Sequence, residues 1–339
     1  MNSRKIFITY PYSEILPRKK AHDVFVFQEC AALHEAGFAV TLLCGKGSLP
    51  DHQLFEHYNT SPFPIKRLPI IRKNNPFNIS WNLPFFFAAQ RELKGTVILS
   101  VLKQAVYHLK RKRPNTRYIY EVHQLTAYDG NLSPLEKFVF ENVDHIVVTT
   151  EQLKHCIPTK TPISVIPLAV NRTPLPPIEK GSPFVLTYVG QLYKGQGVEQ
   201  LLQAAKDIEL RIVGGTPSEI EKLKPLNPKA KFYGFCSPSQ IEEIVRDSHA
   251  FVAPFELTGR MPYVAHTKLY EYANWKRPFI APDAPIVHEH LPTGGVYFKP
   301  RKLSEAIDEL QKNYKELQQE ALPSFTWKAR SDRYKNLLA

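Results

Sequence analysis

The sequence predicts an α/β protein built from two doubly wound units, and three observations support this prediction. Short apolar runs typical of strands alternate with stretches of helical spacing along most of the chain. This alternation breaks at a proline-rich segment spanning 171–183 and then restarts. A chain of 339 residues, of which 43% are hydrophobic and 22% charged, is long enough to form two cores of ordinary globular composition.

In the first half, an apolar strand is expected at 5–11, an amphipathic helix ending at a glycine at 22–37, and a second strand at 38–44. Further strands are expected at 117–123, 145–150 and 163–168. Strands that are separated by helices indicate a parallel sheet with right-handed crossovers.

After the proline-rich segment, strands are expected at 184–190, 210–215, 231–235, 249–255 and 278–282. We therefore expect an N-terminal domain over 1–172, a hinge over 173–183 and a C-terminal domain over 184–323. Ligands of such sheets bind beyond the carboxyl ends of the strands. Two facing sheets predict a binding cleft between the domains.

The cysteines and the apolar runs exclude several classes of protein. Cys30, Cys44, Cys156 and Cys236 lack CxxC spacing, so we expect buried free thiols rather than disulfides or a zinc site. The first apolar run is too short for a signal-peptide core, and none of the later runs reaches the roughly 18 residues that span a bilayer. We expect a cytosolic chain.

The net charge of +12 lies mostly in the first half, with +9 in residues 1–180, and it clusters at 17–22, 65–73 and 109–117. Solvated surface is one interpretation, and attraction to an anionic membrane or a phosphorylated acceptor is the other. We expect no nucleic-acid binding, because no recognised motif accompanies the clusters. The aromatic segment 76–90 fits a helix packed on the core, or alternatively an element that faces the acceptor or dips into a membrane.

Two segments carry candidate phosphate and ribose ligands. In "TYVGQLYKGQG" (187–197), a strand, a glycine turn and Lys194 precede a helix, which suits a phosphate; a surface turn with a capping lysine is the alternative. In "HTKLYEYANWKRPFIAP" (266–282), a helix is expected to begin near Thr267. Its Lys268 would point toward an anion and its Glu271 would accept two ribose hydroxyls. A local Lys–Glu ion pair is the alternative for this segment.

Six segments, in order, resemble those of the retaining glycosyltransferases of family 4, which have the GT-B fold of two Rossmann-like domains facing across a cleft. They are "LEKFVFENVDHIVVTTEQLK" with "ISVIPLAVN", "YVGQLYKGQGVEQLLQAA", "LRIVGG", "KFYGFCSPSQIEEIVRDSHAFVAPF", "HTKLYEYANWKRPFIAP" and "FTWKARSDRYKNLL". The resemblance implies that the last segment is a helix, 324–339, that crosses back to the first domain.

The resemblance also implies an activity and a set of site residues. A sugar would move from a nucleotide-diphospho-sugar to a glycan or lipid-linked acceptor, with retention of configuration and without metal or other cofactor. The basic clusters and the aromatic segment would bring such an enzyme to an acceptor at the inner face of the membrane, in cell-envelope glycan synthesis. His123 and Lys194 would be the catalytic residues. The donor would contact residues of the C-terminal domain: Gly190, Gln191, Lys194, Gly234, Phe235, Thr267, Lys268 and Glu271. His22, Glu256, Arg260 and His266 are candidates for sugar or acceptor contacts, with plain solvent exposure as the alternative.

Some residues depart from the family pattern. Gln191 stands where the family has an arginine, and Tyr263 stands where many members have a glutamate. These substitutions leave open a non-catalytic relative that binds a nucleotide sugar or a glycan as an assembly partner. A sugar-nucleotide epimerase is a third interpretation, which needs cleft carboxylates that the sequence does not reveal.

Overall fold

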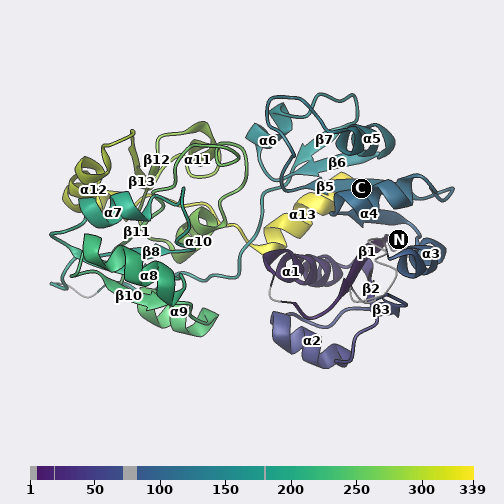
Figure 1. The fold of residues 1–339 in the computed structure, drawn as a ribbon, viewed down its shortest axis with the longest axis horizontal. Coiled ribbons are helices and arrows are strands. Elements are labelled where there is room, and N and C mark those ends of the chain that lie inside the picture. The colour runs from purple at the N-terminus through teal and green to yellow at the C-terminus, as the bar shows by residue number, and fades with distance from the viewer. Residues whose placement is uncertain (1–5, 19, 72–81, 179–180) are drawn as a thin grey trace. The chain divides into compact units, whose positions relative to one another are not determined.

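A computed structural model describes residues 6–18, 20–71, 82–178 and 181–339. The chain divides into two compact units, Met1–Pro167 with Trp327–Ala339, and Leu168–Thr326 (Figure 1). The first unit therefore ends before the expected boundary at residue 172, and the expected hinge at 173–183 falls within the second unit. The C-terminal helix belongs to the first unit.

The described strands of the first unit form a parallel seven-stranded sheet in the order β3-β2-β1-β4-β5-β6-β7. Their bounds are β1 (Phe7–Ile15), β2 (Ala39–Gly45), β3 (Ile65–Leu68), β4 (Thr96–Leu99), β5 (Arg117–Val122), β6 (His145–Val148) and β7 (Ile163–Val165). The strand order reverses between β1 and β4. In doubly wound sheets, ligands bind at such a reversal, outside the carboxyl ends of the strands.

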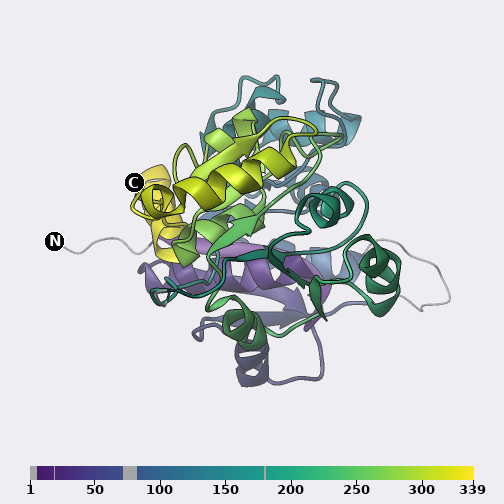
Figure 2. The same ribbon diagram turned by 90° about the vertical axis from the view of Figure 1, so that its left-hand side faces the viewer.

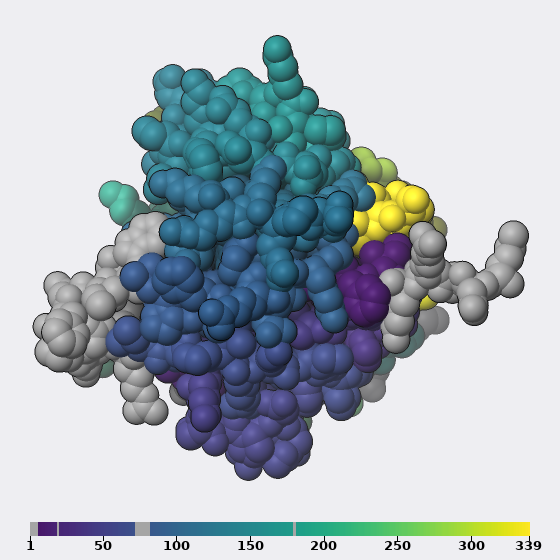
Figure 3. All heavy atoms as spheres, turned by 90° about the vertical axis from the view of Figure 1, so that its right-hand side faces the viewer, coloured from purple at the N-terminus to yellow at the C-terminus, as the bar shows by residue number. Residues whose placement is uncertain are grey.

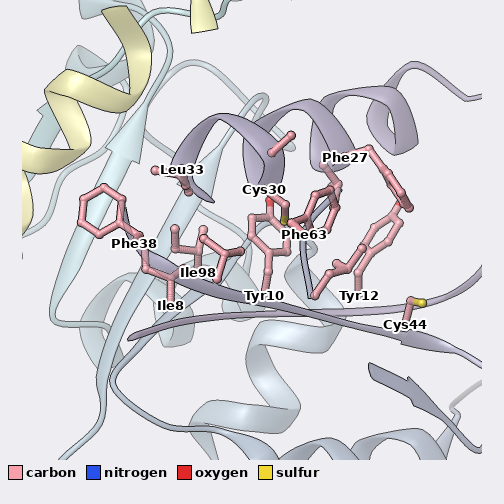
Figure 4. Close-up of a cluster of buried hydrophobic side chains, with 14 of the residues drawn as sticks. Ile8, Tyr10, Tyr12, Phe27, Cys30, Leu33, Phe38, Cys44, Phe63 and Ile98 are labelled. Carbon is pink, nitrogen blue, oxygen red and sulfur yellow. The ribbon is translucent and has the colours of Figure 1, made fainter. Parts of the chain in front are cut away.

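The helices that connect these strands are α1 (Ala21–Glu35), α2 (Asp51–Tyr58), α3 (Leu83–Glu92), α4 (Leu102–Leu109), α5 (Pro134–Asn142) and α6 (Glu151–His155). The last helix of the chain, α13 (Trp327–Leu338), also belongs to this unit. Apolar side chains of β1 pack against Phe27 and Cys30 on the inner face of α1 (Figure 4). Tyr334 of α13 is fully buried in the same cluster. The terminal helix is thus part of the core of the first unit.

The described strands of the second unit form a parallel six-stranded sheet in the order β10-β9-β8-β11-β12-β13, which reverses between β8 and β11. Their bounds are β8 (Val185–Val189), β9 (Glu209–Val213), β10 (Lys231–Gly234), β11 (Ala250–Val252), β12 (Phe279–Pro282) and β13 (Gly295–Phe298). Both sheets are therefore parallel, as the alternation of strands and helices predicts.

The helices of the second unit are α7 (Val198–Ala204), α8 (Pro217–Leu223), the 3₁₀ turn η1 (Lys224–Leu226), α9 (Pro238–Val245), α10 (Thr267–Trp275), α11 (Pro285–His288) and α12 (Leu303–Leu317). Figure 2 views this unit with α12 in front, where it contacts β12 and β13. Capping boxes at Thr216 and Ser237 fix the first turns of α8 and α9.

Each strand segment expected from the sequence contains a strand. Three strands are additional to those expected: β3, β4 and β13. Each is only four residues long, and β3 and β13 lie at or near the sheet edges, where the apolar signal is weak. None of the helices in the described part of the chain is long and apolar enough to cross a bilayer.

The cysteines and the aromatic segment need two corrections. All four cysteines are free thiols, but Cys236 is partly exposed rather than buried. Within the segment 76–90, residues 76–81 lie outside the described residues. The remainder begins α3, whose Phe85 and Phe86 pack in the core as expected, whereas Phe87 is 55% exposed.

Candidate functional site

In the second unit, the loops that follow β8 and β11 contact each other at the reversal of strand order. The Glu256 amide donates to the Gly195 carbonyl at 2.9 Å. At Gly197, whose φ is +70°, a Cβ atom would lie 1.8 Å from the carbonyl oxygen of Pro254. Only glycine permits this approach, which brings together two loops that the sequence places about 60 residues apart.

Glycines also bring together the ends of β8, β9 and β10. The Gly214 amide donates to the Gly234 carbonyl at 2.7 Å, and the Gly190 amide donates to the Val213 carbonyl at 2.9 Å. A Cβ atom at Gly214, whose φ is +117°, would lie 2.0 Å from the Gly190 oxygen. The expected donor residues Gly190 and Gly234 are therefore linked through Gly214, which the sequence analysis did not single out.

Lys194 and Gln191 lie on the turn between β8 and α7, and both are exposed. The Gln191 carbonyl accepts a 2.6 Å hydrogen bond from the hydroxyl of Tyr188, which anchors the turn to the end of β8. Gly197 caps α7, as the glycine-rich turn predicts. This turn can offer the charge of Lys194 to an anion.

Helix α10 begins at Thr267, as expected, but Lys268 in its first turn has protein partners. Its Nζ lies 2.5 Å from Gln196 Oε1 and 3.0 Å from the Tyr188 hydroxyl, and it sits 4.5 Å from the Tyr188 ring centroid. Burial lowers the pKa of Lys268 to about 7, although the nearby Glu271 opposes the shift. Lys268 therefore joins α10 to the glycine turn after β8 and carries an easily displaced proton.

Glu271 pairs with an arginine rather than with the lysine one turn earlier. Its Oε1 lies 2.9 Å from Arg172 Nε, whereas Lys268 is directed at Gln196 and Tyr188. Burial raises the pKa of Glu271, and Arg172 is the main opposing influence. The alternative of a simple Lys–Glu pair is therefore wrong for this helix.

Phe235 follows Gly234 at the end of β10 and is 70% exposed, and Tyr233 on the same strand is 40% exposed. Gly234 has a φ of +65°, which turns the chain sharply at this point. The turn therefore presents an aromatic ring to solvent close to the residues that Gly214 brings together.

Three further candidates lie in the segment between β11 and α10. Glu256 is partly exposed and Arg260 is exposed. His266 is buried, so the alternative of plain solvent exposure is wrong for it: its ring centroid lies 3.8 Å from that of Phe255 and its Nε2 lies 2.8 Å from the Met261 carbonyl. Burial lowers the pKa of His266 to about 4, so its imidazole is neutral. Its contacts with Phe255 and Met261 help to hold the segment between β11 and α10 in place.

In the first unit, His22 and His123 meet beyond the carboxyl ends of β1, β4 and β5. Their ring centroids are 5.6 Å apart, and His22 Nε2 lies 3.1 Å from the Ser100 hydroxyl. Phe25 packs edge-on against the His123 ring at 4.6 Å. Burial and the neighbouring His123 lower the pKa of His22 to about 4. His22 is thus half-buried rather than simply exposed.

A buried acidic residue, Glu121, lies beside His123. Glu121 Oε1 lies 3.5 Å from His123 Nε2, and the same carboxylate pairs with Arg330 of α13. Burial favours the neutral form of Glu121, but Arg330 and His123 outweigh burial and lower the pKa of its carboxyl. An ionised Glu121 can fix the orientation and the tautomer of the His123 ring.

Four residues that were not predicted from the sequence contact the expected site residues: Arg172, Tyr188, Gln196 and Glu121. Arg172 offered a weak signal, because it is an arginine within a proline-rich segment that otherwise reads as a linker. Among the described residues, no group of three or more His, Cys, Asp or Glu side chains is arranged to hold a metal ion.

Most of the second unit is similar in sequence to a known protein family. Residues 183–313 match the family model described as glycosyl transferases group 1. No curated protein matches the chain by sequence.

Solved structures resemble the whole chain. Sucrose-phosphate synthase from Thermosynechococcus elongatus is 20% identical, with a TM-score of 0.66 and 98% of each chain covered. HepE of Anabaena in complex with UDP is 12% identical, with a TM-score of 0.72 and coverage of 98% of this chain and 99% of that one. The pneumococcal O-GlcNAc transferase GtfA in complex with UDP and GlcNAc is 12% identical, with a TM-score of 0.69 and 99% coverage of both. The chain thus has the GT-B fold, and its residues 183–313 resemble the glycosyl transferases group 1 family.

Proposed function

We propose that this protein transfers a sugar from a nucleotide-diphospho-sugar to a glycan or lipid-linked glycan acceptor, with retention of configuration and without a metal ion. One observation carries the proposal. The segment that matches the glycosyltransferase family contains the glycine turn with Lys194 and the start of α10 with Lys268 and Glu271. The structures of HepE and GtfA contain UDP, which supports a nucleotide donor.

The chemistry of sugar transfer suits these residues. As the glycosidic bond breaks, negative charge grows on the diphosphate leaving group, so fixed positive charge at the phosphates is the main catalytic requirement. Exposed Lys194, the amides after Gly190 and the amides of Thr267 and Lys268 at the start of α10 would supply it. Glu271 would hold the ribose hydroxyls, and the backbone at Gly234 and Phe235 would contact the base.

His123 is our candidate for the residue that contacts the donor sugar. Its ring is held between Phe25 and Glu121, and its side chain remains partly exposed. A ring held in this way can present its second nitrogen to a sugar hydroxyl without reorganising. His22 would then support His123, because the two rings are in contact.

A non-catalytic relative that binds a nucleotide sugar or glycan is the second candidate. Gln191 removes a positive charge from the turn after β8, and Lys268 is already bound to Tyr188 and Gln196. Both features reduce the positive charge available to a leaving group, although neither prevents a nucleotide from binding.

Calorimetric titration with UDP, GDP, ADP and dTDP, each in the presence of EDTA, tests the donor site. We expect one nucleotide to bind, and Glu271→Ala to weaken its binding by about 2 kcal/mol, because a charge-assisted hydrogen-bond acceptor is lost. Glu305→Ala is the matched control, since Glu305 is an exposed carboxylate of the same unit on α12, paired with Lys302. Equal binding by wild type and Glu271→Ala would contradict the assignment of Glu271.

Proton NMR of the matching nucleotide sugar then separates the functions. A retaining glycosyltransferase releases the nucleoside diphosphate and transfers the sugar to the acceptor, or to water. The spectrum should then show a new anomeric proton signal of the same configuration as in the donor. An epimerase would change the sugar without an acceptor, and a binding protein would change nothing. Inversion of the anomeric signal, or activity that requires added metal, would contradict those parts of the proposal.

The proposal of a lipid-linked acceptor is supported by a surface of the first unit. We call this surface the α3–α4 patch, and its residues are Leu83, Phe87, Arg91, Lys110, Arg111 and Lys112. All six are exposed, and Leu83 and Phe87 are 41% and 55% exposed. The Arg111 guanidinium carbon lies 6.0 Å from the Phe87 ring centroid and 4.6 Å from that of Tyr107. Figure 3 shows the first unit from the side on which Figure 1 places α3 and α4. An exposed aromatic ring and an exposed leucine beside basic side chains suit an anionic lipid surface.

On this basis the enzyme would work as a peripheral protein at the inner face of the membrane, in synthesis of a cell-envelope glycan. Vesicles that contain anionic phosphatidylglycerol should retain the protein at low salt and release it at high salt. Lys110→Glu with Lys112→Glu should lose this binding. Lys222→Glu with Lys224→Glu, the same charge change on exposed residues of the second unit, should not. A protein that ignores anionic vesicles at low salt would contradict the membrane proposal.

A further inference from the structure

Arg172 reaches the carboxylate expected to hold the ribose from 99 positions earlier in the chain. Its Nε donates to Glu271 Oε1 at 2.9 Å, and its Nη1 lies 3.7 Å from Glu242 Oε1 on α9. The guanidinium carbon also lies 5.3 Å from the ring of Trp275, at the end of α10. Arg172 therefore contacts α9, the middle of α10 and the last residue of α10 at once.

The segment that carries Arg172 is held by backbone hydrogen bonds on both sides. The Val170 amide donates to the Phe325 carbonyl at 3.0 Å, and the Leu175 amide donates to the Trp275 carbonyl at 3.1 Å. The Arg172 side chain is only 11% exposed. Because its backbone and its guanidinium are both fixed, Arg172 can impose an orientation on Glu271 rather than follow it.

Glu271 needs such a partner to serve as a ribose ligand. A carboxylate has about four lone-pair positions and can accept two hydroxyl hydrogens, whereas a protonated carboxyl must donate one of its own. Burial alone would protonate Glu271, since it raises the pKa of the carboxyl. The charged and titratable groups around Glu271 are Arg172, Lys268 and the Tyr272 hydroxyl, with Glu242 acting through Arg172. Lys268 is bound to Gln196 and Tyr188, so Arg172 is the cation that contacts Glu271 directly.

We propose that Arg172 is a positioning residue of the donor site, which holds the Glu271 carboxylate ionised and oriented for the ribose diol of the nucleotide. The bond from Arg172 uses one position on Oε1 and leaves the carboxylate with acceptor capacity for a diol. This inference rests on the proposed function, because it assumes that Glu271 binds ribose.

The test is the pH dependence of nucleotide binding in Arg172→Gln and Arg172→Lys. Calorimetry of the intact chain uses whichever of UDP, GDP, ADP and dTDP binds most tightly, from pH 5 to pH 8. We expect Arg172→Gln to weaken binding about tenfold at pH 7, as loss of a charge-assisted hydrogen bond predicts. Without the arginine the Glu271 carboxyl protonates at a higher pH, so the acidic loss of affinity should move to higher pH. Arg172→Lys keeps the charge and should stay near the wild-type profile.

Arg211→Gln is the matched control. Arg211 is also about one-tenth exposed and also bridges two carboxylates, Glu209 and Asp247, in the same unit. Its substitution removes a comparable ion pair away from Glu271. It should lower thermal stability as much as Arg172→Gln does and leave the pH profile of nucleotide binding unchanged.

A double-mutant cycle with Glu271→Gln decides among the explanations. A positioning role predicts that Arg172→Gln has no further effect once Glu271 is changed. An equal loss in both backgrounds would mean that Arg172 touches the nucleotide itself, which overturns the inference. If Glu271→Gln binds like wild type, the assignment of Glu271 as the ribose ligand fails, and the role of Arg172 with it. If Glu271→Gln weakens binding but the Arg172 variants do not, only the role of Arg172 fails. Should Arg172→Gln not fold, the same cycle and pH profile with Arg172→Met, which removes the charge but keeps an apolar stem beside Trp275, provides the decision.

Discussion

Arg330 on α13 and Glu29 on α1 form an ion pair, with Nε 2.6 Å from Oε2, in which the two side chains are 2% and 1% exposed. Arg330 also pairs with the fully buried Glu121 and donates to the Ile166 and Pro167 carbonyls at 2.8 and 2.7 Å. One guanidinium from the last helix of the chain therefore bridges two buried carboxylates inside the first unit, and one of these lies beside His123.

We predict that Arg330→Met destabilises the first unit by about 3–5 kcal/mol near pH 8, because the two carboxylates lose their buried counter-charge. In this variant both carboxyls have a higher pKa in the folded than in the unfolded protein. Their contribution to stability is then present below about pH 4 and is lost as the pH rises. Urea unfolding of the intact chain should show a smaller loss at pH 5 than at pH 8.

Arg333→Ala, on the same helix, serves as the control. Arg333 is exposed, and its Nη1 lies 3.4 Å from the Val165 carbonyl, so removal should change the free energy of unfolding by no more than about 0.5 kcal/mol. An Arg330→Met protein that unfolds like Arg333→Ala at pH 8 would mean that the pair is not stabilising.

The sequence predicts the fold well because local hydrophobic patterns determine most of its strands and helices. Apolar runs separated by stretches of helical spacing predict the two parallel sheets. The short strand β3 was not predicted, because two of its four residues are Lys66 and Arg67 and the segment resembles a basic loop. The start of α10 at Thr267 also agrees with the prediction, although no side-chain cap fixes it.

The partners of the site residues were not predictable for the opposite reason. Glu271 is bound by Arg172 from 99 positions away, and Lys268 is bound by Tyr188 from 80 positions away. Nothing in the local sequence around Lys268 or Glu271 specifies these contacts. The types of residue at the site could therefore be predicted, but not which charges would be engaged by the protein itself.

We predict that Gly214→Ala disrupts the turn after β8. The added Cβ would lie 2.0 Å from the Gly190 oxygen, at a φ of +117° that side chains rarely adopt, so the turn must move. Nucleotide affinity, measured by calorimetry, should fall at least about tenfold, because a displacement of the order of an ångström is enough to spoil a positioned site.

The control for this prediction is Gly37→Ala in the first unit. Gly37 has a φ of +97°, but no atom lies within 4 Å of its added Cβ, so the substitution strains the backbone without moving a neighbour. We expect a loss of stability of about 1–2 kcal/mol and unchanged nucleotide affinity. Equal affinity in the two alanine variants would show that the turn after β8 does not shape the donor site.

We predict that Lys268 takes up a proton when a nucleoside diphosphate binds. Its pKa is lowered to about 7, so its amine is mainly neutral at pH 8. The negative charge of a diphosphate nearby would raise this pKa and return the proton. At pH 8, the binding enthalpy measured in buffers of different ionisation enthalpy should therefore indicate uptake of up to about one proton.

Two lysine variants make the assignment specific. Lys268→Met should abolish the uptake at pH 8, and the difference between wild type and this variant should shrink at pH 6, where Lys268 is already charged. Lys194→Met should weaken binding but keep the uptake, because Lys194 is exposed. In the free protein the same lowered pKa means that the folded state binds fewer protons than the unfolded state between about pH 7 and pH 10, so stability should rise with pH in that range. Tight nucleotide binding with no proton uptake at pH 8 would place the phosphates away from Lys268 and leave Lys194 as the cation of the donor site.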